Sequence, residues 1–295
     1  MFILQRNYPT IFMRYSLFIV LLFVSVVIGS CGKSSSGNTT TTPSTPTPPA
    51  VPAADKPYQL VWSDEFNAGV SPDTTKWMYE TGGNGWGNNE LEYYTNARPE
   101  NTRISDGNLI IEARKESFGG RNYTSARLLT KNKAQWTYGK FEIRAKIPKG
   151  RGTWPAIWLL SANNPLHWPD DGELDIMEEV GYKPNTIYGT AHNKLYNGAN
   201  GKQKGDNKYI ADAQDSFHVY RLEWTNSQVT WSIDNDTYYT YYDSSLGIDG
   251  WPFNKDFFMI LNVAIGGNWG GAQGVDDSVF PQSMVVDYVR VYQKK

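Results

Sequence analysis

The chain has 295 residues, of which 40% are hydrophobic and 20% charged, and its formal net charge is −2. This length allows one large hydrophobic core or two smaller ones. The near-neutral balance does not favour a polyanion-binding surface, so nucleic acid is not an expected partner. Aromatic residues make up 14% of the chain, with 11 Trp and 19 Tyr. They suit a core, and they equally suit flat amphipathic ligands such as sugar rings.

The N-terminal segment has the pattern of a targeting signal. Residues 15–31, YSLFIVLLFVSVVIGSC, carry no charge, follow Arg14 and end in small residues. This pattern is typical of a signal peptide, and the run is slightly short for the rival interpretation, a membrane-spanning helix. Its end, IGSC, resembles the lipobox of bacterial lipoproteins, and Cys31 is the only cysteine of the chain, which excludes an intramolecular disulfide. We expect residues 1–31 to be a lipoprotein signal peptide ending at a lipidated Cys31, with Met13 as an alternative start.

Two further regions follow the signal segment. Residues 32–56 consist mainly of Ser, Thr, Pro and Ala, which cannot bury enough surface to offset chain entropy. We expect them to be a linker. Residues 57–295 then form the folded part, whose size is typical of one large all-β domain. A lipidated protein of this kind would be anchored in the cell envelope, on the outer-membrane surface or in the periplasm.

The folded part reads as a series of short strands separated by Gly, Asn, Asp and Pro. In GKFEIRAKIP (139–148), apolar and charged residues alternate, as they do in a strand with one buried face. Similar runs occur in GNLIIEARK (107–115), YRLEWTN (220–226), VTWSID (229–234) and MVVDYVRVYQ (284–293). No apolar helical stripe of eleven or more residues follows residue 57. Many short strands predict two stacked antiparallel sheets, with one concave face open to a ligand.

The stretch DGELDIMEEVG (171–181) combines dense negative charge with core residues. Six of the ten residues from Asp170 to Glu179 are acidic, and Leu174, Ile176 and Met177 lie among them. A solvated acidic face does not explain these apolar residues. A calcium loop of the EF-hand type is the other alternative, but its D-x-[DN]-x-[DN]-G spacing is absent.

Strand geometry suggests why the acidic residues alternate with apolar ones. Residues two apart share a face of a strand, so Glu173 and Asp175 point the same way. Strict alternation would turn Glu178 into the core, where an unpaired carboxylate is costly. A β-bulge near Ile176 or Met177 would return Glu178 to the face of the other two carboxylates, a role that bulges often have beside active sites.

Three carboxylates on one face suit retaining glycoside hydrolysis. That reaction needs two carboxyl groups about 5–5.5 Å apart, one acting as nucleophile and the other as acid/base. A central Asp can hydrogen-bond a neighbouring Glu. Crowding of like charges also raises one pKa, so that an acid stays protonated near neutral pH.

At this strand the sequence resembles the family-16 glycoside hydrolases. GELDIMEEVG (172–181) closely resembles their catalytic strand, in the longer E-x-D-x-x-E form typical of laminarinase-like members. The resemblance runs over almost all of residues 57–293. It includes LVWSDEFN (60–67), GWGNNELEYYT (85–95), residues 123–160, LNVAIGGNWGG (261–271) and VVDYVRVYQ (285–293). It implies a concanavalin A-like β-jelly-roll sandwich with a substrate cleft, and an endo-acting, retaining mechanism.

The resemblance also assigns roles to the catalytic strand. It puts the nucleophile on Glu173, the acid/base on Glu178 and the assisting carboxylate on Asp175. A His that lies close to these carboxylates in the family matches His192, for which a satisfied core histidine is the alternative.

Further residues match the cleft of the family. Trp154 and Trp158 lie four residues apart on a strand, so they share a face that could stack glucose rings; a core position is the alternative for Trp158. The loop residues Trp86, Asn88, Asn89 and Trp269 are expected sugar contacts, although Gly-rich loops also serve as turns. Arg127 is expected either to hydrogen-bond sugar hydroxyls or to pair with a carboxylate across the sheet.

One metal site is expected away from the cleft. Asp287 alternates with Val285, Val289 and Val291, and a carboxylate among buried valines needs a partner. Family members often hold a structural Ca²⁺ on the convex side, and the matching positions are Glu65, Gly107 and Asp287. The alternative is an ion pair of Asp287 with Arg290 or Lys140. No cofactor is expected for catalysis.

The sequence departs from the family at two places. Glu92 stands where many laminarinase-like members have Gln, and Asp170 and Asp171 stand where small residues are common. These departures leave the chemistry intact but put subsite detail in doubt.

Other catalytic schemes find no support in the sequence. It contains no G-x-S-x-G, no H-E-x-x-H, no P-loop and no cysteine cluster. A non-catalytic glycan-binding lipoprotein of the same fold remains an alternative, as do enzymes acting on mixed-linkage β-1,3-1,4-glucan or on a galactan. The prediction is a lipid-anchored, monomeric endo-β-1,3-glucanase that cleaves laminarin-like polymers with retention of configuration.

Overall fold

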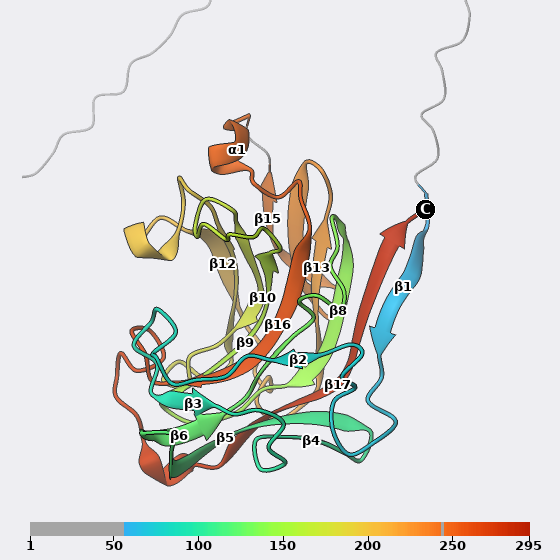
Figure 1. Cartoon of the computed structure of the whole chain (residues 1–295). Helices are drawn as coiled ribbons and strands as arrows, with labels where there is room; N and C mark the ends of the chain where they lie inside the picture. The colour runs from blue at the N-terminus through green and yellow to red at the C-terminus, as the bar shows by residue number, and fades with distance from the viewer. Residues whose placement is uncertain (1–55, 243–244) are drawn as a thin grey trace, which may run out of the picture. The chain divides into compact units, whose positions relative to one another are not determined.

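The computed structural model describes residues 56–242 and 245–295. The predicted signal peptide with Cys31, and the predicted linker up to residue 55, lie outside the described residues. Within the described part, no helix is both long enough and apolar enough to cross a membrane. Nearly all regular structure in it is β-strand (Figure 1).

The larger sheet has ten strands. In sheet order the main path is β15-β14-β13-β8-β17-β5-β6-β3, while β1 pairs with β17 and β4 pairs with β5. Its strands are β1 (Tyr58–Asp64), β3 (Glu92–Tyr94), β4 (Thr102–Ser105), β5 (Asn108–Phe118), β6 (Arg121–Ser125), β8 (Gly139–Lys146), β13 (His218–Trp224), β14 (Gln228–Ile233), β15 (Asp236–Tyr242) and β17 (Gln282–Lys294).

The smaller sheet has seven strands in the order β12-β11-β10-β9-β16-β7-β2. They are β2 (Met78–Tyr79), β7 (Arg127–Leu129), β9 (Thr153–Ser161), β10 (Glu173–Glu178), β11 (Thr186–His192), β12 (Lys204–Tyr209) and β16 (Phe257–Ile265). Its pairings are all antiparallel, and in the larger sheet only β3 and β6 run parallel. The described helices are short: η1 (Gly198–Asn200), α1 (Gly247–Gly250) and η2 (Asp277–Val279).

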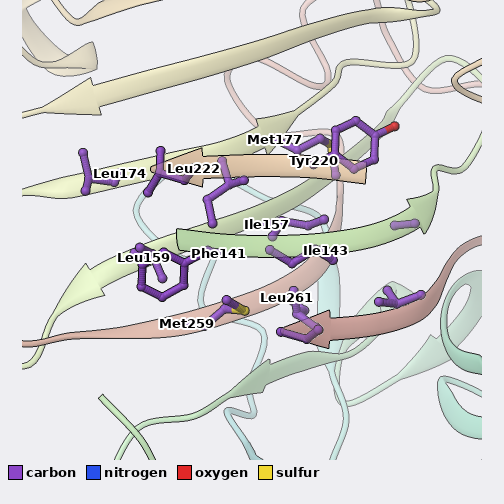
Figure 2. Close-up of a cluster of buried hydrophobic side chains, with 14 of the residues drawn as sticks. Phe141, Ile143, Ile157, Leu159, Leu174, Met177, Tyr220, Leu222, Met259 and Leu261 are labelled. Carbon is purple, nitrogen blue, oxygen red and sulfur yellow. The ribbon is translucent and has the colours of Figure 1, made fainter. Parts of the chain in front are cut away.

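The core lies between the two sheets. Figure 2 shows side chains of β8 and β13 from the larger sheet packed against side chains of β9, β10 and β16 from the smaller one. Leu174 and Met177 of β10 belong to this cluster and are fully buried. Two sheets that bury one face each form a β-sandwich, as the alternating runs predict. The all-β sandwich expected from the sequence is confirmed.

Individual strands follow their sequence pattern closely. In β8, Phe141, Ile143 and Ala145 are fully buried, while the charged residues between them stay at the surface or form ion pairs. In β14, Val229 and Trp231 are likewise fully buried. One apolar face per strand is what a strand needs when only one side of its sheet meets the core.

β17 is the strand that departs from simple alternation. Its pairing with β8 shifts register between Val286 and Tyr288, so Asp287 occupies a bulge. Val286 and Val289 on either side are fully buried, whereas the Asp287 side chain is 35% exposed. The expectation that Asp287 points among buried valines is therefore wrong, because the bulge turns it outward.

Candidate active site

The catalytic segment forms β10 and contains the predicted bulge. Against β9, the register shifts between Asp175 and Met177, so Ile176 is the extra residue. Glu173 lies opposite His192 of β11, and Glu178 lies opposite Tyr188. Cross-strand partners share a face, and the bulge restores Glu178 to the face of Glu173 and Asp175. The apolar residues between them are at most 2% exposed, so the carboxylates project from the side of the sheet away from the core.

Each carboxylate has a close polar neighbour. Trp154 donates its indole N–H to Glu178 Oε1 at 2.9 Å. Trp168 donates its indole N–H to Glu173 Oε2 at 3.1 Å. His192 Nε2 lies 3.0 Å from Asp175 Oδ2 and 3.7 Å from Glu173 Oε1.

The tautomer of His192 follows from its other nitrogen. Gly198 donates its backbone N–H to His192 Nδ1 at 3.0 Å, so Nδ1 acts as an acceptor. In the neutral ring the proton is then on Nε2, which faces Asp175. The core-histidine alternative for His192 is wrong, because the ring lies beside the carboxylates as the resemblance implied.

Burial dominates the electrostatics of the three carboxyl groups. It raises the pKa of Glu173, of Asp175 and of Glu178 to about 8 in each case. The negative charge of Asp175 raises the pKa of both glutamates further, and His192 lowers it. Three interacting acids release their protons as one coupled group, so near neutral pH the cluster still retains protons. One acid can then donate a proton while another is ionised.

Aromatic rings line one side of the carboxylates. Trp154 and Trp269 meet edge to face with centroids 5.6 Å apart, and Tyr188 meets Trp269 edge to face at 5.0 Å. Trp154 and Trp269, both predicted sugar contacts, are thus in contact although they are 115 residues apart in the sequence. Faces of half-buried indole rings are suitable stacking surfaces for sugars.

A second group surrounds Trp158. Its indole N–H donates to Asn262 Oδ1 at 2.8 Å, and the Arg127 guanidinium lies 4.8 Å from its ring centroid. Arg127 also lies 5.1 Å from the Trp86 ring and donates to Glu80 Oε2 at 2.7 Å. Trp158 is only partly buried, and it packs against a small second cluster of buried residues rather than into the main core. For Arg127 the carboxylate-pair alternative holds.

The loop before β3 holds the remaining predicted contacts. Trp86 and Asn89 adopt left-handed backbone conformations, with φ of 52° and 57°. Residues other than glycine pay a steric cost there, and such strain is concentrated at functional sites. Asn89 donates to Asn268 Oδ1 at 2.8 Å, and the backbone N–H of Asn268 donates to the Asn88 carbonyl at 2.7 Å. This loop is therefore joined to the loop that carries Trp269.

The predicted calcium ligands have arginine partners in the structure. Asp287 Oδ2 pairs with Arg144, and Glu65 accepts two hydrogen bonds from Arg290, at 3.0 and 2.7 Å. The alternative of an ion pair at Asp287 is closer to the structure, with Arg144 in place of Arg290 or Lys140. These arginines neutralise both carboxylates, so the side chains as they stand fit a divalent cation poorly.

Sequence reasoning missed three residues of this site: Trp168, Tyr188 and Asn262. Trp168 is the one in direct contact with a catalytic carboxylate. Its position in a Pro-flanked loop five residues before Glu173 was the available signal. The neighbouring Asp171, by contrast, is structural: it is 8% exposed and pairs with Lys255 at 3.0 Å.

Comparisons with known proteins agree with this geometry. The model of Glycosyl hydrolases family 16 matches residues 89–290, more than half of the chain. The chain belongs to glycosyl hydrolase family 16.

Individual members of family 16 are similar over most of the folded domain. A "Beta-glucanase" of Rhodothermus marinus is 52% identical over 244 residues, covering 80% of this chain and 85% of that protein. The solved laminarinase of Rhodothermus marinus has a TM-score of 0.79 at 52% identity and covers 81% of this chain and 98% of its own. A structure described as "a non-specific endo-beta-1,3(4)-glucanase from family GH16" has a TM-score of 0.78 at 47% identity. It covers 84% of this chain and 95% of its own. The chain is thus a glycoside hydrolase with the jelly-roll sandwich of its family.

Proposed function

We propose that this family-16 domain is a retaining endo-β-1,3-glucanase that cleaves laminarin-like polymers. The observation that carries the proposal is the bulged strand β10, which presents Glu173, Asp175 and Glu178 on one face beside Trp154, Trp168 and His192. The substrate class is supported by the relatives, whose names are beta-glucanase and laminarinase.

The first half of the reaction forms a covalent intermediate. Glu173 attacks the anomeric carbon and forms a glycosyl ester, while Glu178 donates its proton to the glycosidic oxygen, whose bond to that carbon breaks. Burial and Asp175 keep Glu178 protonated for this step, because both raise its pKa. The indole N–H of Trp168 favours the ionised form of Glu173, since it lowers the pKa of that carboxyl.

The second half releases the sugar. Glu178, now a carboxylate, takes a proton from a water molecule, whose oxygen attacks the same carbon and displaces Glu173. Two displacements on opposite faces restore the original configuration. Both groups end in their starting protonation states, so no cofactor takes part in these steps.

Binding energy for the glucan comes from the aromatic rings. Trp154 contacts both Glu178 and Trp269, and the rings of Trp86 and Trp158 each lie near the Arg127 guanidinium. Two aromatic groups beside one catalytic strand suit a polymer that occupies several subsites, which is what endo-acting cleavage requires. Stacking of each sugar on an indole adds apolar burial without fixing the sugar's hydroxyl pattern.

A test of the proposal compares several glycans. The full chain is incubated with laminarin, barley mixed-linkage glucan, agarose and carrageenan, and reducing ends are measured, with Glu173→Gln as the blank. Rapid release from laminarin that is abolished in Glu173→Gln is the expected result. Activity on a galactan alone would overturn the substrate, and tight binding without release would make the protein a lectin-like module.

Mixed-linkage glucan is the second candidate substrate. The similar protein described as non-specific for β-1,3(4)-glucan motivates it. Comparable kcat/KM values on laminarin and barley glucan would extend the activity to both linkages, whereas a large preference for laminarin would restrict it to β-1,3-glucan.

Structural calcium stays a prediction. Strand register supports it, because β1 ends at Asp64 opposite Val289 and β5 pairs Leu109 with Val286, which brings Glu65 and Gly107 beside Asp287. The arginine partners of both carboxylates oppose it. A melting temperature several degrees higher in CaCl₂ than in EGTA would establish the site. Equal melting temperatures would refute it.

Anchoring through Cys31 is likewise a proposal, and with it a location in the cell envelope. Its support is the uncharged stretch 15–31 with the IGSC ending. Cells fed a labelled fatty acid should label the wild-type chain but not Cys31→Ala, and only the wild type should sediment with membranes. Equal labelling of the two would exclude Cys31 as the lipid site. We propose that the protein is a monomer. Light scattering of the Cys31→Ala variant in buffer without detergent would check its molar mass.

A further inference from the structure

Two buried glutamates lie behind the glycan-binding loops. Glu90 is 4% exposed and Glu92 is fully buried. Glu90 forms an isolated β-bridge with Gly266, and Glu92 Oε2 accepts a hydrogen bond of 2.6 Å from the backbone N–H of Ile265. The pair therefore joins two segments that we call the 85–91 loop and the 266–271 loop.

These two loops carry most of the predicted loop contacts to sugar. Trp86, Asn88 and Asn89 belong to the 85–91 loop, and Trp269 belongs to the 266–271 loop. The Asn88–Asn268 and Asn89–Asn268 hydrogen bonds link the loops at the surface. The two glutamates add a second connection, through the Glu90–Gly266 bridge and the Glu92–Ile265 hydrogen bond.

Hydrogen bonds in this region converge on Glu90. The Tyr94 hydroxyl donates to Glu90 Oε2, and Asn88 Nδ2 donates to Glu90 Oε1, both at 3.1 Å. The Tyr94 hydroxyl in turn accepts from Asn262 Nδ2 at 3.2 Å, so its single proton is committed to Glu90. Each carboxylate oxygen of Glu90 thus accepts a hydrogen bond from a neighbouring side chain.

The hydrogen bonds of Glu92 differ from those of Glu90, because only one of its two carboxylate oxygens has a donor in the part of the chain that the structure describes. Its Oε2 has the Ile265 N–H, but its Oε1 is buried without a hydrogen-bond donor among the described residues. The groups that face this pair are Tyr94, which donates to Glu90, and Arg127, which is held by Glu80 and the two indoles. An unpaired buried carboxylate oxygen is costly, whereas a carboxylic acid brings its own donor. Burial, and then the charge of Glu90, hold the pKa of Glu92 well above its usual range.

We propose that protonated Glu92 is a positioning residue, whose acid proton bridges to Glu90 and holds the 85–91 loop against the 266–271 loop. When Glu92 loses this proton, two negative charges share one buried site and repel each other. The loops then separate, and glycan binding weakens on the alkaline side. This effect on binding rests on the proposed function, whereas the shared proton itself does not.

The variant Glu92→Gln keeps the shape of the side chain but removes its titratable proton. Its amide is a permanent donor toward Glu90, so the bridge no longer depends on pH. In the full-length wild type, we expect KM for laminarin to rise severalfold between pH 7 and pH 9.5. In Glu92→Gln we expect KM to stay flat over this range, while kcat falls with pH in both proteins as Glu178 ionises. Wild-type and Glu92→Gln KM profiles that coincide would overturn the coupling of the pair to glycan binding.

Two further variants control the experiment. Glu92→Leu fills the space without a donor, so its KM should be raised at every pH. Glu142→Gln changes another buried glutamate, which lies on β8 of the larger sheet, and should keep the wild-type rise of KM. A flat profile in Glu142→Gln would show that any buried Glu→Gln change has the effect, which overturns the specific role of Glu92.

A stability measurement tests the shared proton without any substrate. Because the pKa of Glu92 is raised on folding, wild-type stability is lost as pH rises from the unfolded pKa toward the folded one. Urea unfolding should therefore show that the free energy of unfolding of Glu92→Gln, relative to the wild type, increases steadily from pH 5 to pH 9. A difference that does not vary with pH would overturn the shared proton, even if laminarin is cleaved. If the stability difference between Glu92→Gln and the wild type varies with pH but the chain cleaves no glucan, the proposed function is refuted and the shared proton is supported.

Discussion

The indole N–H of Trp168 lies 3.1 Å from Glu173 Oε2 and donates a hydrogen bond to it. Trp168 is an exposed tryptophan, at 43%, and it comes from the loop that precedes the catalytic strand. The ring centroid is also 6.1 Å from that of His192. Glu173 is therefore held between a loop and a neighbouring strand, and both contacts lower its pKa against the larger raising effect of burial.

Trp168→Phe should impair the nucleophile while keeping the aromatic ring. A hydrogen bond to a charged group is worth about 1.5–3 kcal/mol, so we expect kcat to fall roughly tenfold or more. The bond lowers the pKa of Glu173, so its loss should also move the acid limb of the pH–rate profile to higher pH. Initial rates on laminarin from pH 4 to pH 10 check both effects. Trp168→Ala is the matched control, and an equal acid limb in wild type and Trp168→Phe would contradict the assignment.

Trp154→Phe should move the alkaline limb instead. The indole N–H of Trp154 lowers the pKa of Glu178, so removing that donor raises this pKa. Glu178 must be protonated to act as the acid, and its higher pKa extends activity to higher pH. The same rate profiles measure the shift. An alkaline limb that moved toward lower pH would exclude Glu178 as the partner that sets it.

Asp175→Asn should shift the same limb in the opposite direction. The charge of Asp175 raises the pKa of Glu178, and the neutral amide lacks this charge. We expect the alkaline limb to move to lower pH and kcat to fall by roughly 10²–10⁴, the usual range for losing a group of the acid–base machinery. Full activity in Asp175→Asn would leave this central carboxylate without a catalytic role.

Glu178→Gln should abolish hydrolysis and stabilise the protein at alkaline pH. Burial raises the pKa of Glu178 to about 8, so the wild type loses stability as pH rises from the unfolded value, near 4.5, to about 8. The amide has no such loss, and we expect an advantage of about 4 kcal/mol at pH 8 that vanishes near pH 4. Urea unfolding at several pH values measures it. A constant difference across this range would show that Glu178 is not desolvated.

Much of the fold follows from local patterns. Phe141, Ile143 and Ala145 are buried because alternating residues of a strand lie on opposite faces, and this rule needs no knowledge of distant residues. The same rule, together with the cost of burying a carboxylate, predicted a bulge near Ile176 or Met177, and the structure has it at Ile176. The family resemblance of the same strand then supplied the roles of Glu173 and Glu178.

Other features depend on which segments meet in space. Asp287 was misplaced because nothing in its own strand marks the bulge that turns it toward Arg144. Arg127 had two candidate roles, and only the structure showed its ion pair with Glu80. The linker, the anchor and Cys31 stay predictions from sequence alone.

The sequence by itself determined the all-β class, the carboxylates of β10 and the family, because these depend on local periodicity and on motifs of adjacent residues. The tertiary structure alone decided which side chains surround those carboxylates and how the binding loops are joined. Glu92 and Ile265 are 173 residues apart, yet one hydrogen bond connects them. Such partners follow from sheet order and register, which bring together residues whose own neighbourhoods carry no sign of each other.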